Sequence, residues 1–256
     1  MDVLCAEGIG IEFGGVIALS DVEFKVSRGE VVGLIGPNGA GKTTMLNVIS
    51  GISRPSEGRL LFCGAEITGW SPHKIAKLGV ARTFQIVQSF THMTVRENVA
   101  VGAMFAGSKA ISRSEALDLA EHALQRVGLS GKGGKAPRQL TLSDRKRLEL
   151  ARAIAMEPQL LLLDEVMAGL NHSEIDAVID LIRQLNASGL TILMVEHVMK
   201  AIMAVCHRII VLQFGHKIAD EAPEKVVSDP KVISAYLGDR FAKRHRAHNV
   251  ATECPP

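Results

Sequence analysis

Long apolar runs are absent from the 256 residues. No stretch of about 18 consecutive apolar residues occurs, so no segment has the composition of a membrane-spanning helix. The first residues, Met1 to Glu7, lack a basic stretch followed by an apolar one, and we therefore expect no secretory signal. The four cysteines are scattered without a CxxC pair, which argues against a disulfide framework or a zinc site. These absences suit a reducing compartment and predict a cytoplasmic protein.

An excess of charge of either sign is also missing. The chain has 29 basic and 27 acidic residues, a net charge of +2, and the basic stretch 238–256 accounts for that surplus. A face that binds a nucleic-acid duplex usually carries a much larger basic excess, so we expect no nucleic-acid partner. The mean hydropathy of +0.19 permits a buried interface with a partner, but a large core would give the same value.

Strand-like and helix-like segments alternate along much of the chain. Strands are expected over 3–35, and apolar runs of strand length recur at 160–163, 190–195 and 208–212. Helical segments near 172–187 and 197–205 separate the later runs, and this alternation predicts an α/β core.

The stretch of about 86–158 interrupts the alternation. It predicts almost only helix, with a capping-box pattern at Thr94–Glu97 and apolar residues at helical spacing over 114–127. We therefore expect a helical subdomain inserted into one domain of residues 1–237. The remaining 238–256 have little apolar content, and we expect a basic, mobile tail there.

A glycine-rich motif follows the apolar run 31–35. It matches GxxxxGK[ST] and comprises Gly36, Pro37, Asn38, Gly39, Ala40, Gly41, Lys42 and Thr43, with Thr44 next to it. Backbone N–H groups of such a loop surround phosphate oxygens at the start of a helix. Lys42 then reaches the β- and γ-phosphates, and the Thr43 hydroxyl ligates Mg²⁺. A chance glycine-rich turn is the alternative, which the match between a strand and a helix disfavours. The motif predicts a nucleotide phosphate and Mg²⁺ as ligands, and the lack of an Asn-Lys-x-Asp motif for guanine disfavours a GTPase.

Two carboxylates end the apolar run Leu160–Leu163. Asp164, at a strand tip beside a phosphate loop, is suited to the Mg²⁺ shell. Glu165, one residue further, is suited to polarise the attacking water. Acidic residues also occur at the ends of many strands without any catalytic role. The pair therefore indicates a catalytic site only in combination with the phosphate loop.

These motifs occur in the order of a known family. From about residue 3 to 237 the chain resembles the nucleotide-binding subunits of ABC transporters, and most of all those of branched-chain amino acid (Liv-type) importers. The stretches 91–99 and 235–238 look specifically Liv-like. The resemblance implies a P-loop NTPase (RecA-like) core with an antiparallel β-subdomain and an inserted α-helical subdomain.

The resemblance also assigns roles to single residues. It places Gln85 in a Q-loop, where it touches Mg²⁺ and the attacking water, and His197 within reach of the γ-phosphate. It places Phe13 where an aromatic ring stacks on adenine, and the D-loop, 168–171, across a dimer interface. Each residue has a simpler interpretation: Gln85 as an exposed loop amide, His197 as a histidine at a helix N-terminus, and Phe13 as a core residue.

One motif departs from the family. The signature Leu-Ser-Gly-Gly-Gln, which caps the γ-phosphate bound to the opposite subunit, stands here as Leu140-Thr141-Leu142-Ser143-Asp144. Thr141 keeps a hydroxyl, and Ser143 is a good N-cap whose backbone N–H can point at phosphate. Leu142 is bulkier than glycine, and Asp144 brings negative charge towards a polyanion. We expect Arg145, Lys146 and Arg147 to offset that charge, and the segment to close over ATP less effectively than the consensus.

The function implied by the resemblance is an ATP-hydrolysing motor subunit at the cytoplasmic face of the inner or plasma membrane. The implied partners are two transmembrane permease subunits, a second ATPase subunit in a homo- or heterodimer, and indirectly an external solute-binding protein. The permease would dock near 85–105. Because the ATPase does not touch the solute, the assignment of branched-chain or related amino acids as the transported solute depends on the resemblance alone.

Two other functions stay open. A nucleotide-binding scaffold that hydrolyses weakly beside a more active ATPase would fit the altered signature. A soluble ABC protein of translation or DNA repair is a further alternative, but those proteins carry tandem cassettes or long coiled-coil arms, and this sequence has neither.

Overall fold

The computed structural model of the chain describes residues 1–84, 89–105 and 111–237. The strands are β1 (Asp2–Phe13), β2 (Val16–Ser27), β3 (Val31–Ile35), β4 (Glu57–Phe62), β5 (Ala65–Glu66), β6 (Val80–Arg82), β7 (Leu160–Asp164), β8 (Thr191–Val195), β9 (Arg208–Gln213) and β10 (His216–Glu221). The helices are α1 (Lys42–Ile49), α2 (Pro72–Lys77), α3 (Val95–Phe105), α4 (Arg113–Arg126), α5 (Leu142–Ile154), α6 (His172–Ala187), α7 (Met199–Val205), α8 (Pro223–Ser228) and α9 (Pro230–Leu237). A short 3-10 helix covers Pro137–Gln139.

A mostly parallel sheet forms the centre of the molecule. Its strand order is β10-β9-β3-β8-β7-β6, and only β10 runs antiparallel to its neighbour. Every residue of β3, β7 and β8 is buried. Leu161 and Leu163 belong to one apolar cluster, whereas Leu160 and Leu162 belong to a second, because successive side chains point to opposite faces. The uninterrupted apolar runs of the sequence are therefore strands covered on both faces.

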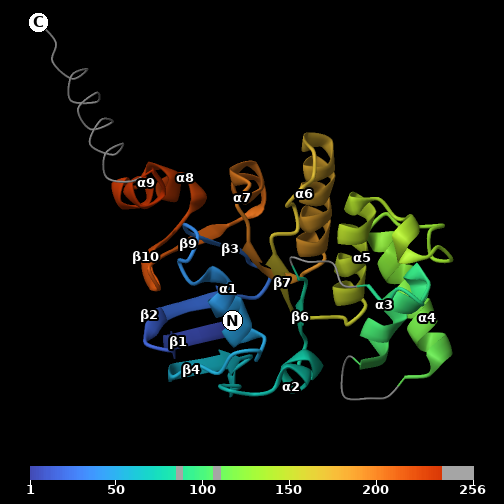
Figure 1. Cartoon of the computed structure of the whole chain (residues 1–256), viewed down its shortest axis with the longest axis horizontal. Coiled ribbons are helices and arrows are strands. Elements are labelled where there is room, and N and C mark those ends of the chain that lie inside the picture. The colour runs from blue at the N-terminus through green and yellow to red at the C-terminus, as the bar shows by residue number, and fades with distance from the viewer. Residues whose placement is uncertain (85–88, 106–110, 238–256) are drawn as a thin grey trace, which may run out of the picture.

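One face of this sheet is covered by α1 and a second sheet. The antiparallel sheet has the order β2-β1-β4-β5, and Figure 1 shows α1 between its strands and β3. Met45, Leu46 and Ile49 of α1 are fully buried in the same cluster as Leu4 and Ile9 of β1. The helix that begins in the glycine-rich motif is thereby held on both sides by apolar contacts.

The helices of the central part of the sequence lie at one end of the molecule. Figure 1 shows α3, α4 and α5 together there, away from the antiparallel strands. The predicted capping box is present, since the Thr94 N–H and hydroxyl each donate to Glu97 Oε2 at 2.9 Å. A Cβ on Gly102 would lie 2.5 Å from the Arg152 carbonyl oxygen, so α3 approaches α5 closely. The predicted fold class is confirmed, while the boundaries at 86 and 158 stay predictions.

The strands β4 to β6 and β10, and the helices α2, α8 and α9, were not expected from the sequence. The tail expected over 238–256 lies outside the described residues. Across the part of the chain that the structure describes, no helix combines the length and the apolar character that crossing a membrane requires.

Candidate active site

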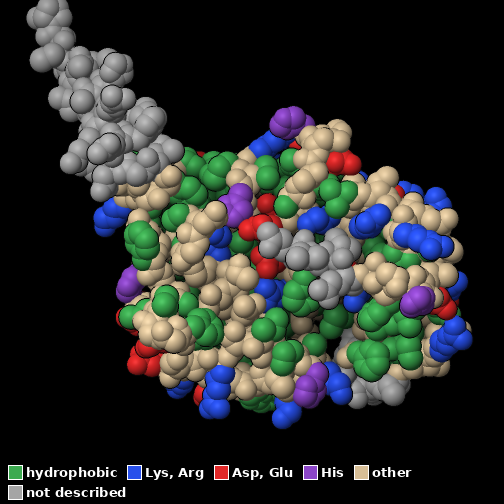
Figure 2. All heavy atoms as spheres, in the orientation of Figure 1, with side chains coloured by type: hydrophobic (Ala, Val, Ile, Leu, Met, Phe, Trp, Pro, Cys, Tyr) green, Lys and Arg blue, Asp and Glu red, His purple; other side chains and the backbone are tan. Residues whose placement is uncertain are grey.

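Three neighbouring strands of the central sheet end at the predicted site residues. β3 leads into the glycine-rich motif, β7 ends at Asp164, and β8 is followed by Glu196 and His197. Since β3 pairs with β8 and β8 pairs with β7, all in parallel, their carboxyl ends lie side by side. Ligands of open α/β sheets bind at this edge. Figure 2 shows acidic side chains and a histidine close together near the middle of the face that it presents.

Two glycines of the motif are required by close backbone approaches. A Cβ on Gly36 would lie 2.2 Å from the Leu212 carbonyl oxygen, and one on Gly41 would lie 2.6 Å from the Ala18 carbonyl oxygen. Gly41 also adopts the left-handed φ of 101° at the N-cap of α1. The loop therefore takes a path that only glycine permits, with the start of α1 directed at it. This is the cradle that phosphate groups require.

Lys42 lies inside this loop. Its Nζ donates to the carbonyl oxygens of Gly36 at 2.8 Å and Pro37 at 2.9 Å, and the residue is buried. Burial lowers the pKa of the Lys42 ammonium, while the nearby carboxylates of Glu165 and Asp164 oppose that shift. The ammonium is thus held by carbonyl groups that a phosphate can replace as its partner.

Asp164 is fixed by a residue to which the sequence analysis assigned no role. Arg82 Nη2 lies 2.8 Å from Asp164 Oδ2, and both side chains are only 6% exposed. The same guanidinium donates to Asn47 Oδ1 at 2.8 Å and to Ser50 Oγ at 3.0 Å. The Asp164 N–H also donates to the hydroxyl of Thr83 at 3.3 Å. Arg82 therefore joins the strand that carries Asp164 to the helix that carries Lys42.

Glu165 and His197 meet across the ends of β7 and β8. His197 Nε2 lies 3.1 Å from Glu165 Oε1, and the Glu165 N–H donates to the Val195 carbonyl oxygen at 2.9 Å. Glu165 has a φ of 49°, which is uncommon for a side chain other than glycine. The two residues are thus in contact, and Glu196, which directly precedes His197, is a second residue that the sequence analysis left without a role.

Phe13 and Gln85 have different outcomes. Phe13, at the end of β1, is 53% exposed, so it is not the core residue of the simpler interpretation. Its stacking on adenine stays a prediction. Gln85 lies outside the described residues, and its predicted role is untested.

The signature segment differs from expectation in the residue that caps α5. Thr141, not Ser143, is the N-cap of α5, because its hydroxyl accepts the N–H of Asp144 at 3.1 Å. Ser143 is buried within the first turn. Leu142 is exposed, and a Cβ on Gly169 of the D-loop would meet it at 3.3 Å.

The charge of Asp144 is neutralised by a residue other than its neighbours. Lys132 Nζ lies 2.6 Å from Asp144 Oδ2. Successive side chains of the helix α5 point to different sides, so the basic residues next to Asp144 have other partners. Arg145 Nε donates to the Leu140 carbonyl at 3.2 Å, and Lys146 Nζ donates to the Glu165 carbonyl at 3.4 Å. The ion pair of Asp144 is therefore made by Lys132, whereas we expected Arg145, Lys146 and Arg147 to offset its charge.

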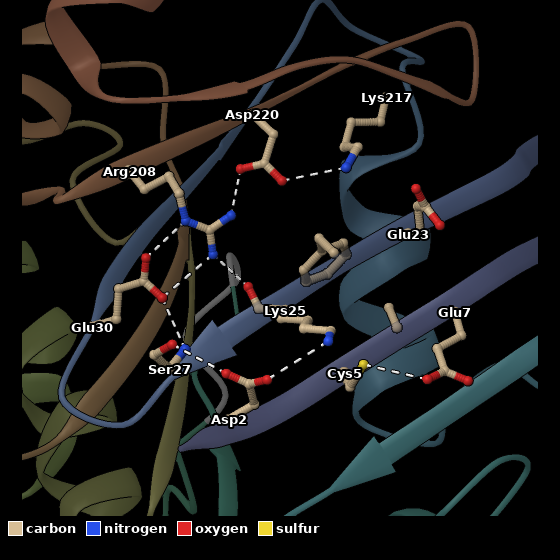
Figure 3. Close-up of a pocket in the computed structure, with 12 residues that line it drawn as sticks. Asp2, Cys5, Glu7, Glu23, Lys25, Ser27, Glu30, Arg208, Lys217 and Asp220 are labelled. Carbon is tan, nitrogen blue, oxygen red and sulfur yellow. Dashed lines mark hydrogen bonds and ion pairs between the residues drawn. The ribbon is translucent and has the colours of Figure 1, made fainter.

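A charged recess on another part of the molecule is distinct from this site. Figure 3 shows its residues between β1, β2, β9 and β10, around a volume of about 710 Å³. Arg208 binds Glu30 (Nε to Oε1, 2.8 Å) and Asp220, and Asp220 also binds Lys217 at 3.3 Å. Burial alone would raise the pKa of the Glu30 carboxyl, but hydrogen bonds from Arg208 and the Ser27 N–H outweigh it and hold that pKa below its ordinary value. Arg208 also donates to the Lys25 carbonyl of β2, and this guanidinium therefore joins the edge of the central sheet to the antiparallel sheet.

Two family models match the chain. One, described as ABC transporter, matches residues 19–168, and the other, described as branched-chain amino acid ATP-binding cassette transporter, matches residues 216–242. The second match covers β10, α8 and α9, which the sequence analysis did not anticipate as elements.

Two relatives align with nearly the whole chain. It is 39% identical over 250 residues to LivG of Escherichia coli (strain K12), a high-affinity branched-chain amino acid transport ATP-binding protein, across 93% of this chain and 98% of LivG. BraF of Pseudomonas aeruginosa, which carries the same description, is 40% identical with the same coverage.

Solved structures share the fold. The ADP conformation of MJ1267, an ATP-binding cassette of an ABC transporter, matches with a TM-score of 0.86 and 31% identity, across 93% of this chain and all of that one. The dimeric post-hydrolysis state of the cassette MJ0796, bound to ADP and Pi, matches with a TM-score of 0.77 and 26% identity, across 86% and 98% of the two chains. Since a family model spans more than half of the sequence and the relatives cover almost all of it, the chain belongs to the ABC transporter family, as one of its ATP-binding, ATP-hydrolysing cassettes.

Proposed function

We propose that this cassette is the motor subunit of an importer for branched-chain or related amino acids. The observation that carries the proposal is the identity of 39–40% to LivG and BraF over 93% of the chain, since both names describe branched-chain amino acid transport. The C-terminal match over 216–242 to a family of the same description supports it.

The site residues have the following roles in this proposal. The loop of Gly36 to Thr43, together with Thr44, holds the phosphates of ATP, and Lys42 exchanges its carbonyl partners for phosphate oxygens. Glu165 polarises the attacking water, and His197 contacts the γ-phosphate. Phe13 stacks on the adenine ring.

The residues at this edge of the sheet also fit a magnesium ion. The Thr43 side chain is exposed at the first turn of α1, and the Asp164 carboxylate is fixed at the tip of β7. Hydroxyl and carboxylate oxygens are ligands that Mg²⁺ prefers. Thr43 and Asp164, with Gln85, would hold it, and the ion would neutralise charge that develops on the phosphates.

A second ATPase subunit completes each nucleotide site in the proposal. The signature segment, 140–144, would close over the ATP of the partner, as Thr141 and Ser143 contact its phosphates. Lys132 neutralises Asp144 at 2.6 Å, so this closure brings an ion pair rather than a bare carboxylate towards the nucleotide. The partner is a second copy of this chain or a related ATPase.

Exposed apolar side chains at the two ends of α3 are suited to the permease. Phe90, Met93, Met104 and Phe105 are exposed, and Phe105 is 69% exposed. Figure 2 shows hydrophobic side chains gathered over the part of the molecule where Figure 1 places α3. Exposed apolar side chains of this number in one region indicate an interaction surface. In the proposal, the two permease subunits dock here from the membrane and place the chain at the cytoplasmic face.

A weakly hydrolysing scaffold is the second candidate function. The observation that favours it is the exposed Leu142, which occupies a glycine position of the signature. In this case the consensus signature of the partner would close over the ATP bound to the phosphate loop of this chain. The altered signature of this chain would close poorly over the ATP bound to the partner. Separate inactivation of the two phosphate loops in the complex distinguishes the two functions.

Gentle purification of the tagged chain from its own membranes tests the proposal. We expect two polytopic permease subunits, a second ATPase and, in transport assays, an external solute-binding protein with branched-chain amino acid specificity. Recovery of the chain alone, or with ribosomes or DNA-repair proteins, would contradict the transport function.

A further inference from the structure

Glu196 is a buried carboxylate between two parts of the active site. It follows β8 and is only 3% exposed. Its Oε1 accepts the backbone N–H of Met167 at 2.9 Å, and its Oε2 accepts the backbone N–H of His197 at 3.3 Å. Met167 directly precedes the D-loop, 168–171. One carboxylate therefore joins the start of the D-loop to the segment that carries the site histidine.

Two further hydrogen bonds converge on the backbone carbonyl of Glu165. The Ala168 N–H donates to the Glu165 carbonyl at 3.2 Å, and Lys146 Nζ donates to that carbonyl at 3.4 Å. Lys146 is 5% exposed and lies close enough to act electrostatically on Glu196. Glu196, Lys146 and the backbone of Glu165 thus form one buried cluster of polar groups next to the contact between the Glu165 and His197 side chains.

The energetic importance of Glu196 follows from its burial. A buried backbone N–H without an acceptor is costly, and the Met167 N–H is in this position because Met167 is only 1% exposed. Burial raises the pKa of the Glu196 carboxyl, and Glu165 adds to that rise, while the two N–H groups and Lys146 oppose it. An apolar side chain at this position would avoid the cost of burying a carboxylate, but it would leave the buried Met167 N–H without an acceptor.

We propose that Glu196 is a positioning residue for ATP hydrolysis, which fixes the D-loop and the His197 backbone in one relation to Glu165. The inference rests on the proposed function, in which the partner ATPase contacts the D-loop. A displacement of the D-loop by the partner then moves the His197 backbone with it, because one oxygen of the Glu196 carboxylate holds the Met167 N–H and the other holds the His197 N–H. Within the described residues, the hydrogen bonds of the Glu196 carboxylate go to Met167 and His197 and not to the phosphate loop, so we expect its effect on the chemical step and not on nucleotide affinity.

The variant E196Q tests this with little change in volume. A glutamine side chain has one acceptor oxygen, so either Met167 or His197 loses its acceptor and faces an amide N–H instead. E149Q is the matched control. Glu149 is also a buried glutamate, 6% exposed, and burial raises the pKa of its carboxyl as well, but its carboxylate pairs with Arg152 at 2.6 Å within α5 and not with the backbone of Met167 or His197.

Two measurements are made on the full chain with the subunits that co-purify with it. The first compares kcat with the dissociation constant for Mg-ATP, and we expect E196Q to lower kcat about 10- to 100-fold with the dissociation constant within about twofold. The second is amide hydrogen exchange over 166–171, which should accelerate in E196Q. E149Q should keep both kcat and the exchange over 166–171 at the wild-type level.

The outcomes separate the inference from the proposed function. Unchanged kcat and unchanged exchange in E196Q would overturn the inference while wild-type turnover stands. A parallel loss of kcat and ATP affinity, or faster exchange throughout the chain, would show general destabilisation and would also overturn it. Wild-type protein that never hydrolyses ATP would instead contradict the proposed function.

Discussion

The imidazole Nε2 of His197 lies 3.1 Å from the carboxylate Oε1 of Glu165. The contact is made between the ends of two neighbouring parallel strands, and a backbone hydrogen bond from Glu165 to Val195 holds those ends together. Both groups are therefore oriented before any nucleotide binds. A water molecule activated there would encounter a carboxylate whose position is set by the sheet and not by a mobile loop.

Substitution of Glu165 should separate ATP binding from hydrolysis. For E165Q we expect ATP turnover to fall at least about 100-fold, because the carboxylate that polarises water is lost. The dissociation constant for ATP should stay within about threefold, since Lys42 and the phosphate loop are unchanged. Phosphate release and equilibrium binding measure the two quantities. H197A should act in the same direction, whereas H122A, an exposed histidine of α4, should leave turnover unchanged.

Removal of Lys132 should weaken closure over the partner's nucleotide. In K132A the Asp144 carboxylate is left without its ion pair, and we expect turnover of the complex to fall about two- to tenfold. The double variant K132A/D144Q should recover most of the loss, because glutamine carries no charge. K132A turnover equal to that of the wild type would show that Asp144 needs no compensation.

Restoration of the consensus residues is the complementary experiment. S143G/D144Q should raise ATP turnover of the complex, provided that the altered signature limits closure. The same rate before and after the exchange would contradict the expectation that the segment is less effective than the consensus.

Loss of Arg82 should destabilise the fold strongly. Arg82 and Asp164 are both 6% exposed, and removal of one partner leaves a buried charge, so R82M should lower the free energy of unfolding by about 3–5 kcal/mol. R59M is the control, because Arg59 binds Glu7 at the similar distance of 2.7 Å on the surface. There we expect at most about 1 kcal/mol. Urea unfolding of both variants measures the contrast, and equal losses would contradict it.

The Glu30–Arg208 ion pair should make stability depend on acid pH. The pKa of the Glu30 carboxyl lies below its ordinary value in the folded chain, so its contribution is full above the ordinary pKa of about 4.3 and disappears as pH falls through the folded value. E30Q should cost about 1–3 kcal/mol at pH 7. The difference from wild type should shrink between pH 5 and pH 3, and a constant difference would contradict the prediction. Denaturant unfolding over this range measures it.

Much of the fold and the nucleotide site was predictable because the signals are local. The apolar run of β7 with Asp164 and Glu165 at its end, and the glycines that precede Lys42, encode a strand, a turn and a helix within a few residues. The strands β4 and β6 were missed because they have few buried residues or only three residues in all, and their partners lie far away in the sequence.

The residues that support the site were missed for a related reason. Arg82 meets Asp164 across 82 positions, and Glu196 meets Met167 across 29. Nothing in the neighbouring sequence marks such pairs. Asp144 shows the same limit at shorter range, since the basic residues next to it point away along α5 while Lys132, 12 positions before it, reaches its carboxylate.

The two apolar clusters on opposite faces of the central sheet have a consequence for divergence within the family. The helices α3, α4 and α5 belong to one cluster, and α1 with the antiparallel sheet belongs to the other. Substitutions that share no neighbours change stability almost independently. A lineage can therefore remodel the helical side to suit a new membrane partner while the side that holds the nucleotide is inherited unaltered.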